Sequence, residues 1–132
     1  MFFVRGSELR ATHFLIFGGN VMKTAVVGSR TIKNLDISPY IPKETDLIIS
    51  GGANGVDKIA EDYADRHRIS KLILRPKYNL YRKNAPLIRN DEIVEISDKI
   101  IVFWDGKSRG TKHTIEYARK INKEIEIITI TM

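Results

Sequence analysis

The stretch Ile49-Ser50-Gly51-Gly52-Ala53-Asn54-Gly55-Val56-Asp57 joins the end of an apolar run to a glycine-rich loop and then to a helical pattern. Apolar and half-apolar positions recur after the loop at i, i+3, i+4, i+7, i+8 and i+11, counted from Val56, which is the spacing of one face of a helix. We predict a strand over Asp46–Ser50 and a helix over Gly55–His67. A strand, a glycine loop and a helix in this order are typical of a parallel α/β sheet.

The same alternation of apolar runs and helical patterns continues on both sides of this stretch. The other candidate strands are Thr24–Val27, Leu72–Leu74, Lys99–Trp104 and Glu124–Ile130. All but the last are nearly continuous apolar runs, as expected for parallel strands covered on both faces. Glu124–Ile130 alternates polar and apolar residues, which suits an edge strand.

Helical patterns lie between several of these strands. One covers Leu87–Ile96 and begins near Pro86, a good first-turn residue, and another contains Thr114, Ile115, Ala118 and Ile121. Thr31–Thr45 holds two prolines and fits only a short or broken helix. The sequence therefore predicts an α/β, Rossmann-like three-layer sandwich with a mostly parallel central sheet of about five strands.

Composition limits the class of protein. The chain has 132 residues, 42% hydrophobic and 29% charged, which fits one globular domain. It has no cysteine, which excludes disulfides and thiolate metal sites and fits a cytoplasmic location. The longest apolar run, Ile100–Trp104, is far shorter than the ~20 residues of a membrane span, so we expect no membrane partner.

The amino-terminal residues differ from the rest of the chain. Met22 precedes the first predicted strand, so we expect the domain to occupy residues 22–132 and residues 1–21 to be an extension outside it. The apolar segment Phe14–Phe17 is too short for the ~7 to 15 apolar residues of a signal peptide. An additional strand over Phe14–Phe17 is the alternative.

Three predicted strands are followed by loops that contain glycine. They are Gly28-Ser29-Arg30, the loop over 51–55, and the loop from Asp105 to Thr111. In a parallel sheet, ligands sit beyond the carboxyl ends of the strands, where the strand order reverses. Glycine lets an anion approach the backbone, and the first-turn amides of a helix favour negative charge. These loops predict a phosphate site.

Net charge supports an anionic ligand without specifying nucleic acid. The balance of 22 basic and 16 acidic residues is +6, but no run of five or six basic residues occurs. The helix dipole contributes only ~0.3 to 1 kcal/mol, so we expect Arg30, Lys107 or Arg109 to add charge-assisted hydrogen bonds of roughly 1.5 to 3 kcal/mol each.

Several familiar motifs are absent. Gly106-Lys107-Ser108 is not a P-loop, because Ile101 stands where that motif needs its first glycine. The loop over 51–55 is not the dinucleotide G-x-G-x-x-G motif. The histidines lack metal-ligand spacing and no hydrolytic triad is indicated, so no metal is predicted and the cofactor stays unknown. By pattern alone, Asp57 is a helix cap, while Arg89 and Asn90 face solvent.

Four segments taken together resemble the SLOG superfamily, and within it the YspA/YpsA-related branch. They are Val27–Arg30, Ile49–Asp57 with Ala60, Tyr81–Asn90 and Phe103–Thr111, and the likeness covers nearly all of residues 22–130. Relatives in this superfamily include DNA-processing protein A and the LOG-type, cytokinin-activating phosphoribohydrolases. The resemblance implies a Rossmann-like domain that binds a nucleotide-derived ligand.

The resemblance also implies which residues face that ligand. Arg89 and Asn90 would hold a phosphate or a ribose hydroxyl, which replaces the solvent-facing interpretation, and Asp57 would fix the arginine or a sugar oxygen. The implied ligand-binding residues are Gly28, Ser29, Arg30, Ser50, Gly51, Gly52, Ala53, Asp57, Arg89, Asn90, Asp105, Gly110 and Thr111.

One departure from the family pattern concerns catalysis. The phosphoribohydrolases carry a P-G-G-x-G-T-x-x-E motif whose glutamate assists glycosidic cleavage, whereas Thr114 stands at the matching position here. Glu116 lies two residues further, about 200° around a helix, and should point away. The hydrolase mechanism thereby loses its best-matched acid.

Three functions remain open at this point. The leading hypothesis is binding or sensing of a nucleotide or an ADP-ribose-like metabolite. The second is a hydrolase that cleaves an N-glycosidic or phosphate bond with Asp57 or Asp105 as its carboxylate, so whether the chain is an enzyme is open. The third is single-stranded nucleic-acid binding through the basic surface. A homodimer is compatible with all three and is not indicated by the sequence.

Overall fold

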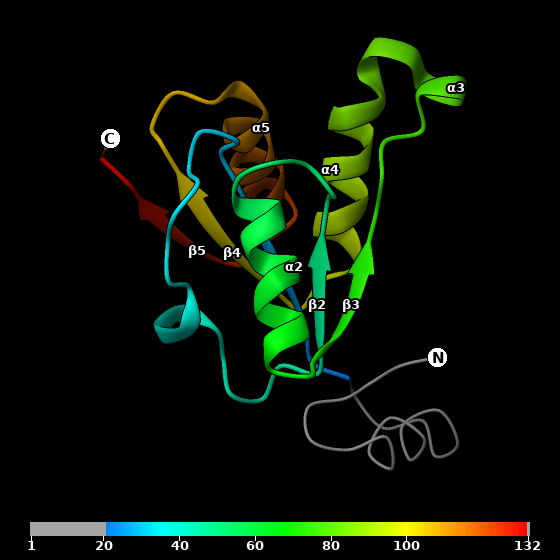
Figure 1. Cartoon of the computed structure of the whole chain (residues 1–132). Coiled ribbons are helices and arrows are strands. Elements are labelled where there is room, and N and C mark those ends of the chain that lie inside the picture. The colour runs from blue at the N-terminus through cyan, green and yellow to red at the C-terminus, as the bar shows by residue number, and fades with distance from the viewer. Residues whose placement is uncertain (1–20, 132) are drawn as a thin grey trace.

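The computed structural model describes residues 21–131, which form a five-stranded sheet covered by helices (Figure 1). The strands are β1 (Lys23–Gly28), β2 (Leu47–Ser50), β3 (Ser70–Ile73), β4 (Lys99–Trp104) and β5 (Glu124–Thr129). Their spatial order is β3-β2-β1-β4-β5, and every neighbouring pair is parallel. This confirms the Rossmann-like α/β class. The order reverses between β1 and β4, and β5 lies at an edge as predicted.

Helices lie on both faces of the sheet. The longer ones are α2 (Val56–Arg66), α4 (Ala85–Ile96) and α5 (Arg109–Lys120). On one face, Ala60 and Tyr63 of α2 pack in one apolar cluster with Val26 of β1. On the other, Ile93 of α4 and Ile115 of α5 share a second cluster with residues of β1, β2 and β4. Because alternate residues of each strand point to opposite faces, each buried strand supplies both clusters. The three-layer prediction is confirmed.

Of the short elements, one was expected and two were not. The segment Thr31–Thr45 holds one 3-10 turn, η1 (Ser38–Tyr40), as its prolines suggest. Between β3 and α4 the structure adds α3 (Tyr78–Tyr81) and η2 (Arg82–Asn84), which the sequence pattern did not predict. These turns are too short for an apolar period to reveal them.

Most strand and helix ends lie within one residue of the prediction, and the largest shift is at β3. β3 begins at Ser70, two residues before the predicted strand, and ends at Ile73. The apolar pattern misses its start because β3 is an edge strand, in which Lys71 is exposed. α4 begins at Ala85 and holds Pro86 in its first turn, close to the prediction.

The amino-terminal predictions lie largely outside the described residues. The alternative strand over Phe14–Phe17 falls there entirely, and so does the proposed extension except for its last residue. Among residues 21–131, no helix combines the length and apolar character that crossing a bilayer requires.

Candidate functional site

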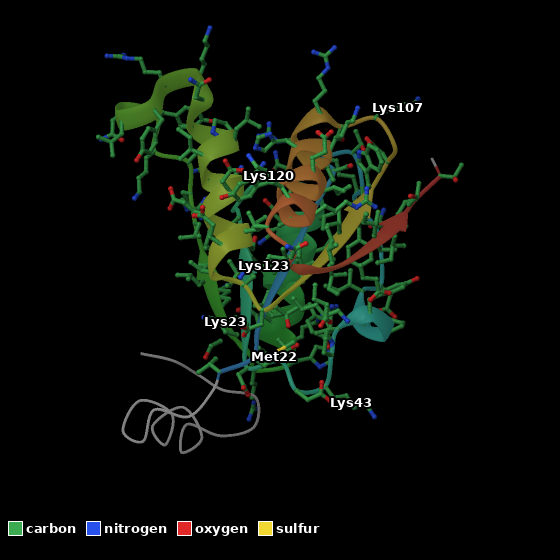
Figure 2. The ribbon with its side chains drawn as sticks, turned by 180° about the vertical axis from the view of Figure 1, so that it is seen from behind. Met22, Lys23, Lys43, Lys107, Lys120 and Lys123 are labelled. Carbon is green, nitrogen blue, oxygen red and sulfur yellow. The ribbon has the colours of Figure 1, made fainter. Side chains whose placement is uncertain are left out.

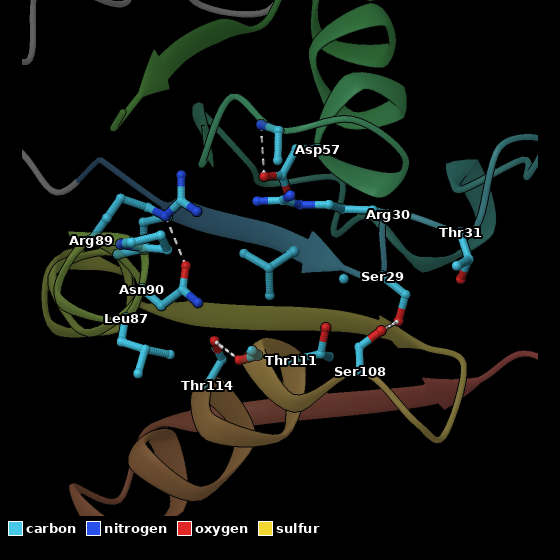
Figure 3. Close-up of a pocket in the computed structure, with 16 residues that line it drawn as sticks. Ser29, Arg30, Thr31, Asp57, Leu87, Arg89, Asn90, Ser108, Thr111 and Thr114 are labelled. Carbon is cyan, nitrogen blue, oxygen red and sulfur yellow. Dashed lines mark hydrogen bonds between the residues drawn. The ribbon is translucent and has the colours of Figure 1, made fainter. Parts of the chain in front are cut away.

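A pocket of about 300 Å³ opens at the carboxyl ends of β1 and β4, where the strand order reverses (Figure 3). It lies between the loop after β1, the loop after β2, and the amino-terminal turns of α4 and α5. The residues expected to bind a ligand that line it are Gly28, Ser29, Arg30, Ala53, Asp57, Arg89, Asn90, Gly110 and Thr111. The topology therefore brings together, at the carboxyl ends of the strands, segments that are far apart in the sequence.

The loop after β1 begins at a glycine because β4 lies directly against it. A Cβ on Gly28 would lie 2.1 Å from the carbonyl oxygen of Phe103. The next amide, that of Ser29, donates a hydrogen bond of 3.0 Å to the same carbonyl. The Ser29 side chain is buried, and its Oγ accepts from the Asp105 amide at 3.0 Å. These contacts tie the β1 loop to the β4 loop.

Arg30 is consequently held at the mouth of the pocket. Its side chain is exposed and extends toward Asp57 (Figure 3). Within the described residues, the Arg30 guanidinium has no hydrogen bond and no carboxylate at ion-pair distance. It is therefore a cation available to a ligand.

Asp105 organises its own loop. Its Oδ1 accepts hydrogen bonds of 2.8 Å from the amides of Lys107 and Ser108, and its Oδ2 accepts one of 2.9 Å from Thr31 Oγ1. These donors hold the pKa of Asp105 well below its usual range, chiefly through the two amides. Asp105 does not line the pocket, and so strongly acidic a carboxylate is a poor proton acceptor.

The loop after β2 packs around Asp57 and Arg89. A Cβ on Gly51 would lie 2.8 Å from both Arg89 Nη1 and Asp57 Oδ2, so glycine gives these side chains access to the backbone. Asp57 Oδ2 accepts a hydrogen bond of 3.1 Å from the Ala53 amide. Burial raises the pKa of Asp57, while that amide and the Arg89 charge oppose the rise.

Arg89 is buried, with 6% of its surface exposed. Its Nη1 donates to the carbonyls of Gly51 and Leu74, and its Nε donates to Asn90 Oδ1 at 2.8 Å. Burial lowers the pKa of Arg89, and the Asp57 charge opposes this. The solvent-facing interpretation from the helical pattern was wrong for Arg89. The first turns of α4 lie beside the loops at the carboxyl ends of the strands, where backbone carbonyls need hydrogen-bond donors.

The amino ends of α2 and α5 differ in what they offer a ligand. The Val56 amide of α2 donates to the Ser29 carbonyl at 3.4 Å, so the β1 loop covers this end. In α5, the first amide that bonds to Ser108 is that of Lys112. Within the described part of the chain, the amides of Arg109–Thr111 have no acceptor. The β1 loop therefore takes up one first-turn donor of α2, whereas the first three amides of α5 stay free and two of these residues, Gly110 and Thr111, line the pocket.

Thr114 and Glu116 lie as the helical spacing predicts. Thr114 is 2% exposed, lines the pocket, and donates through Oγ1 to the Gly110 carbonyl at 3.1 Å. Glu116 is exposed and does not line the pocket. The position that carries a glutamate in phosphoribohydrolases thus presents no carboxylate here.

A second pocket of about 380 Å³ adjoins the first. The expected residues that line it are Arg30, Gly51, Gly52, Ala53 and Arg89. Ser50 lines neither pocket, and its Oγ instead donates to the Asp57 carbonyl at 3.3 Å. Among residues 21–131, no group of histidine, aspartate and glutamate side chains is placed to hold a metal ion.

Sequence reasoning did not assign several pocket residues. Those of the second pocket are Asn54, Arg75, Pro76 and Tyr78. Those of the first are Val27, Thr31, Pro86, Leu87, Ile93, Ser108 and Thr114. Arg75 and Tyr78 follow β3, an edge strand that lies away from the reversal of strand order, so the rule for ligand sites in parallel sheets does not point to its loop. An arginine two residues after the end of an edge strand was the available signal.

The parallel sheet, with a pocket at the reversal of its strand order, defines a Rossmann-like α/β domain. The chain is similar to the crystal structure of DNA processing protein A from Streptococcus pneumoniae, with a TM-score of 0.64 and 20% identity over 85% of this chain and 52% of that one. It is also similar to DNA processing protein A from Helicobacter pylori, with a TM-score of 0.63 and 23% identity over 84% of this chain and 66% of that one. The latter structure concerns the single-stranded DNA binding mode of that protein.

These similarities show the fold. The chain spans about half the length of the first neighbour and just under two thirds of the second. No protein-family model matches the chain. No curated protein matches it either.

Proposed function

We propose that this chain binds a phosphate-bearing, nucleotide-type small molecule in the pocket between β1, α4 and α5. The observation that carries the proposal is that Arg30, whose guanidinium has no carboxylate at ion-pair distance in the described residues and interacts with Asp57 only at longer range, lies at the same pocket as the free first-turn amides of α5. A guanidinium and backbone amides converging on one cavity are the usual donors for a phosphate. The pocket volume of about 300 Å³ is at the small end of ligand sites.

The remaining polar groups suit a sugar attached to that phosphate. Asn90 uses its Oδ1 to accept from Arg89, which leaves its amide NH₂ to donate. Asp57 uses Oδ2 to accept from Ala53, which leaves Oδ1 to accept from a hydroxyl group. With a phosphate at Arg30, a ribose between Asn90 and Asp57 would accept a hydrogen bond from the Asn90 NH₂ and donate one to Asp57 Oδ1.

The same geometry favours binding over hydrolysis. Asp105 is held by its own loop, and Thr114 stands where the phosphoribohydrolases have their glutamate. Among the described residues that line the pocket, Asp57 is the only aspartate or glutamate, and it already receives the Ala53 amide. Asp57 is therefore the carboxylate on which the hydrolase alternative depends.

The proposal includes membership of the SLOG superfamily and its YspA/YpsA-related branch. It is supported by the placement of the four characteristic segments around one pair of adjoining pockets. The fold shared with DNA processing protein A is consistent with it. The proposed ligands are therefore nucleotides and ADP-ribose-like compounds.

Calorimetric titration and thermal unfolding with AMP, ADP, ADP-ribose and NAD test this function. A ligand at one hundred times its Kd should stabilise the chain by about 2.7 kcal/mol. Arg30→Ala should weaken binding at least about tenfold, because one charge-assisted hydrogen bond contributes roughly 1.5 to 3 kcal/mol. Arg119→Ala, at the opposite end of α5, is the matched control. Absence of binding across the whole panel would reject the proposal.

Single-stranded DNA is the second candidate ligand. It is favoured by the shared fold with the Helicobacter pylori protein and by exposed basic residues at the same edge of the sheet, including Arg30, Arg75 and Lys107. Anisotropy of a labelled oligothymidine should then fall steeply with added salt, and Lys107→Ala should reduce the slope by about one. No binding at about 50 mM salt would dismiss this candidate.

A further inference from the structure

The two pockets share part of their lining, including two arginines. Arg30, Ala53 and Arg89 line both of them, so the first pocket continues into the second past the Arg30 side chain. The second pocket extends from this point toward the segment that follows β3. A ligand longer than a monophosphate placed at Arg30 therefore has a second cavity to enter.

The second pocket carries an excess of positive charge. Three arginines line it, Arg30, Arg75 and Arg89, and no aspartate or glutamate of residues 21–131 does. The first pocket, in contrast, contains the Asp57 carboxylate. Like charges at one cavity repel one another, so a negatively charged ligand group relieves this repulsion in the second pocket more than in the first.

The Arg75 side chain has hydrogen-bond donors that are free to bind a ligand. Its Nη1 makes a hydrogen bond of 3.4 Å to the Gly52 carbonyl, and it has no carboxylate at ion-pair distance among the described residues. Gly52 has a φ of +73°, and a Cβ there would lie 2.8 Å from Arg75 Nη1. Glycine thus permits both the turn of the loop and the close approach of the arginine. The Arg75 guanidinium keeps most of its N–H donors for another acceptor.

From these observations we infer that the ligand carries two linked anionic groups, as in a nucleoside diphosphate, and that Arg75 binds the second group. The inference rests on the proposed function, because Arg30 and the α5 amides bind the first group. Arg30 lies between the two groups and contacts both. Arg75 is then the residue that distinguishes diphosphates from monophosphates.

Calorimetric titration of the full chain with ADP and AMP tests this inference. The unaltered chain should bind ADP at least about tenfold more tightly than AMP, because one charge-assisted hydrogen bond is added. Arg75→Ala should bring the ratio of the two affinities close to one. Arg75→Lys, which keeps the charge but loses the planar fork, should give an intermediate ratio. Inorganic pyrophosphate and phosphate should show the same preference as the two nucleotides.

The outcomes separate the inference from the proposed function. Arg119→Ala, roughly 7.5 Å along α5 beyond Thr114, the last α5 residue that lines the pocket, should leave the ratio unchanged. Equal affinities of the unaltered chain for ADP and AMP, or an equal loss of both in Arg75→Ala, would overturn the inference and leave the proposed function standing. Failure of both nucleotides to bind would overturn the proposed function, and the inference with it.

Discussion

At the scale of single residues, the site depends on side chains that bond to backbone far away in the sequence. Arg89 donates to Gly51 and Leu74, which lie 38 and 15 residues earlier. The helical pattern around Arg89 cannot reveal these carbonyls, so it suggested a solvent-facing residue. Arg89 thus links α4 to the loops after β2 and β3, and Asp57 lies beside it in the same buried cluster.

Replacing Arg89 tests its structural role. Arg89→Lys should lower the free energy of unfolding by about 1.5 to 3 kcal/mol, because one ammonium cannot reproduce the bonds to two carbonyls and Asn90. Urea unfolding measures this change. Arg75→Lys is the matched control and should change stability by less than about 0.5 kcal/mol, since Arg75 is exposed. Equal effects of the two substitutions would contradict this role.

The raised pKa of Asp57 predicts how stability depends on pH. The folded chain holds the Asp57 proton to higher pH than the unfolded chain, whose pKa is near 3.8. The free energy of unfolding should therefore fall, relative to Asp57→Asn, as pH rises from 3.8 through the raised pKa. Each pKa unit corresponds to about 1.4 kcal/mol.

Urea unfolding of both proteins between about pH 3.5 and 7 checks this prediction. Asp36 and Asp105, whose pKa values are lowered, are present in both proteins and cancel in the difference. A difference in stability that does not change with pH would show that Asp57 has no raised pKa in the folded chain.

At the scale of elements, the pocket forms where β1 and β4 meet at their carboxyl ends. Gly28 pairs with Phe103 in this register, and the two loops that follow are joined through Ser29. The β1 loop accepts a hydrogen bond from the first amide of α2, while the first three amides of α5 have no acceptor in the described residues. Close packing of two neighbouring strands thus positions the loops that border the first pocket.

Alanine at Gly28 tests this contact between strands. Its Cβ would meet the Phe103 carbonyl, which is backbone and cannot rotate away, so Gly28→Ala should cost about 1 to 3 kcal/mol of stability. Gly110→Ala is the matched control in α5, where the nearest atom is 3.9 Å from the added Cβ. It should be neutral or stabilise the chain by up to about 1 kcal/mol. Thermal unfolding compares the two, and equal stabilities would contradict the packing described for Gly28.

At the scale of the whole molecule, charge is spread over both ends of the sheet. Figure 2 shows Lys107 at one end, with Met22, Lys23 and Lys43 at the other. Net positive charge by itself therefore does not locate the site. The reversal of strand order between β1 and β4 does, because ligand crevices in parallel sheets lie at such a point, and the first pocket opens there.

Removing residues 1–21 tests the proposed domain boundary. The chain from Met22 to Met132 should keep its Tm to within about 4 °C, which corresponds to roughly 1 kcal/mol for a domain of this size. Met22 itself belongs to the folded part, because its amide donates to Asp46 Oδ2 at 3.0 Å. A collapse of the Tm measured by circular dichroism would place residues 1–21 within the domain.

Hydrophobic periodicity alone determined the class of fold, the positions of all five strands to within about two residues, and the presence of the three longer helices. Those features follow from local spacing, because burial on a sheet or a helix repeats with a fixed period. The glycine-containing loops after β1, β2 and β4 also led to the prediction that a ligand would lie at the carboxyl ends of the strands.

Only the tertiary structure decided which groups remain free at that edge. Its loops are joined by contacts such as that between Asp105 and Ser29, which are 76 residues apart. Such contacts engage Asp105, cover the amino end of α2, and leave Arg30, Arg75 and the first turn of α5 available. Hydrogen-bond partners are assigned by proximity in space, and a linear pattern of residues carries no record of them.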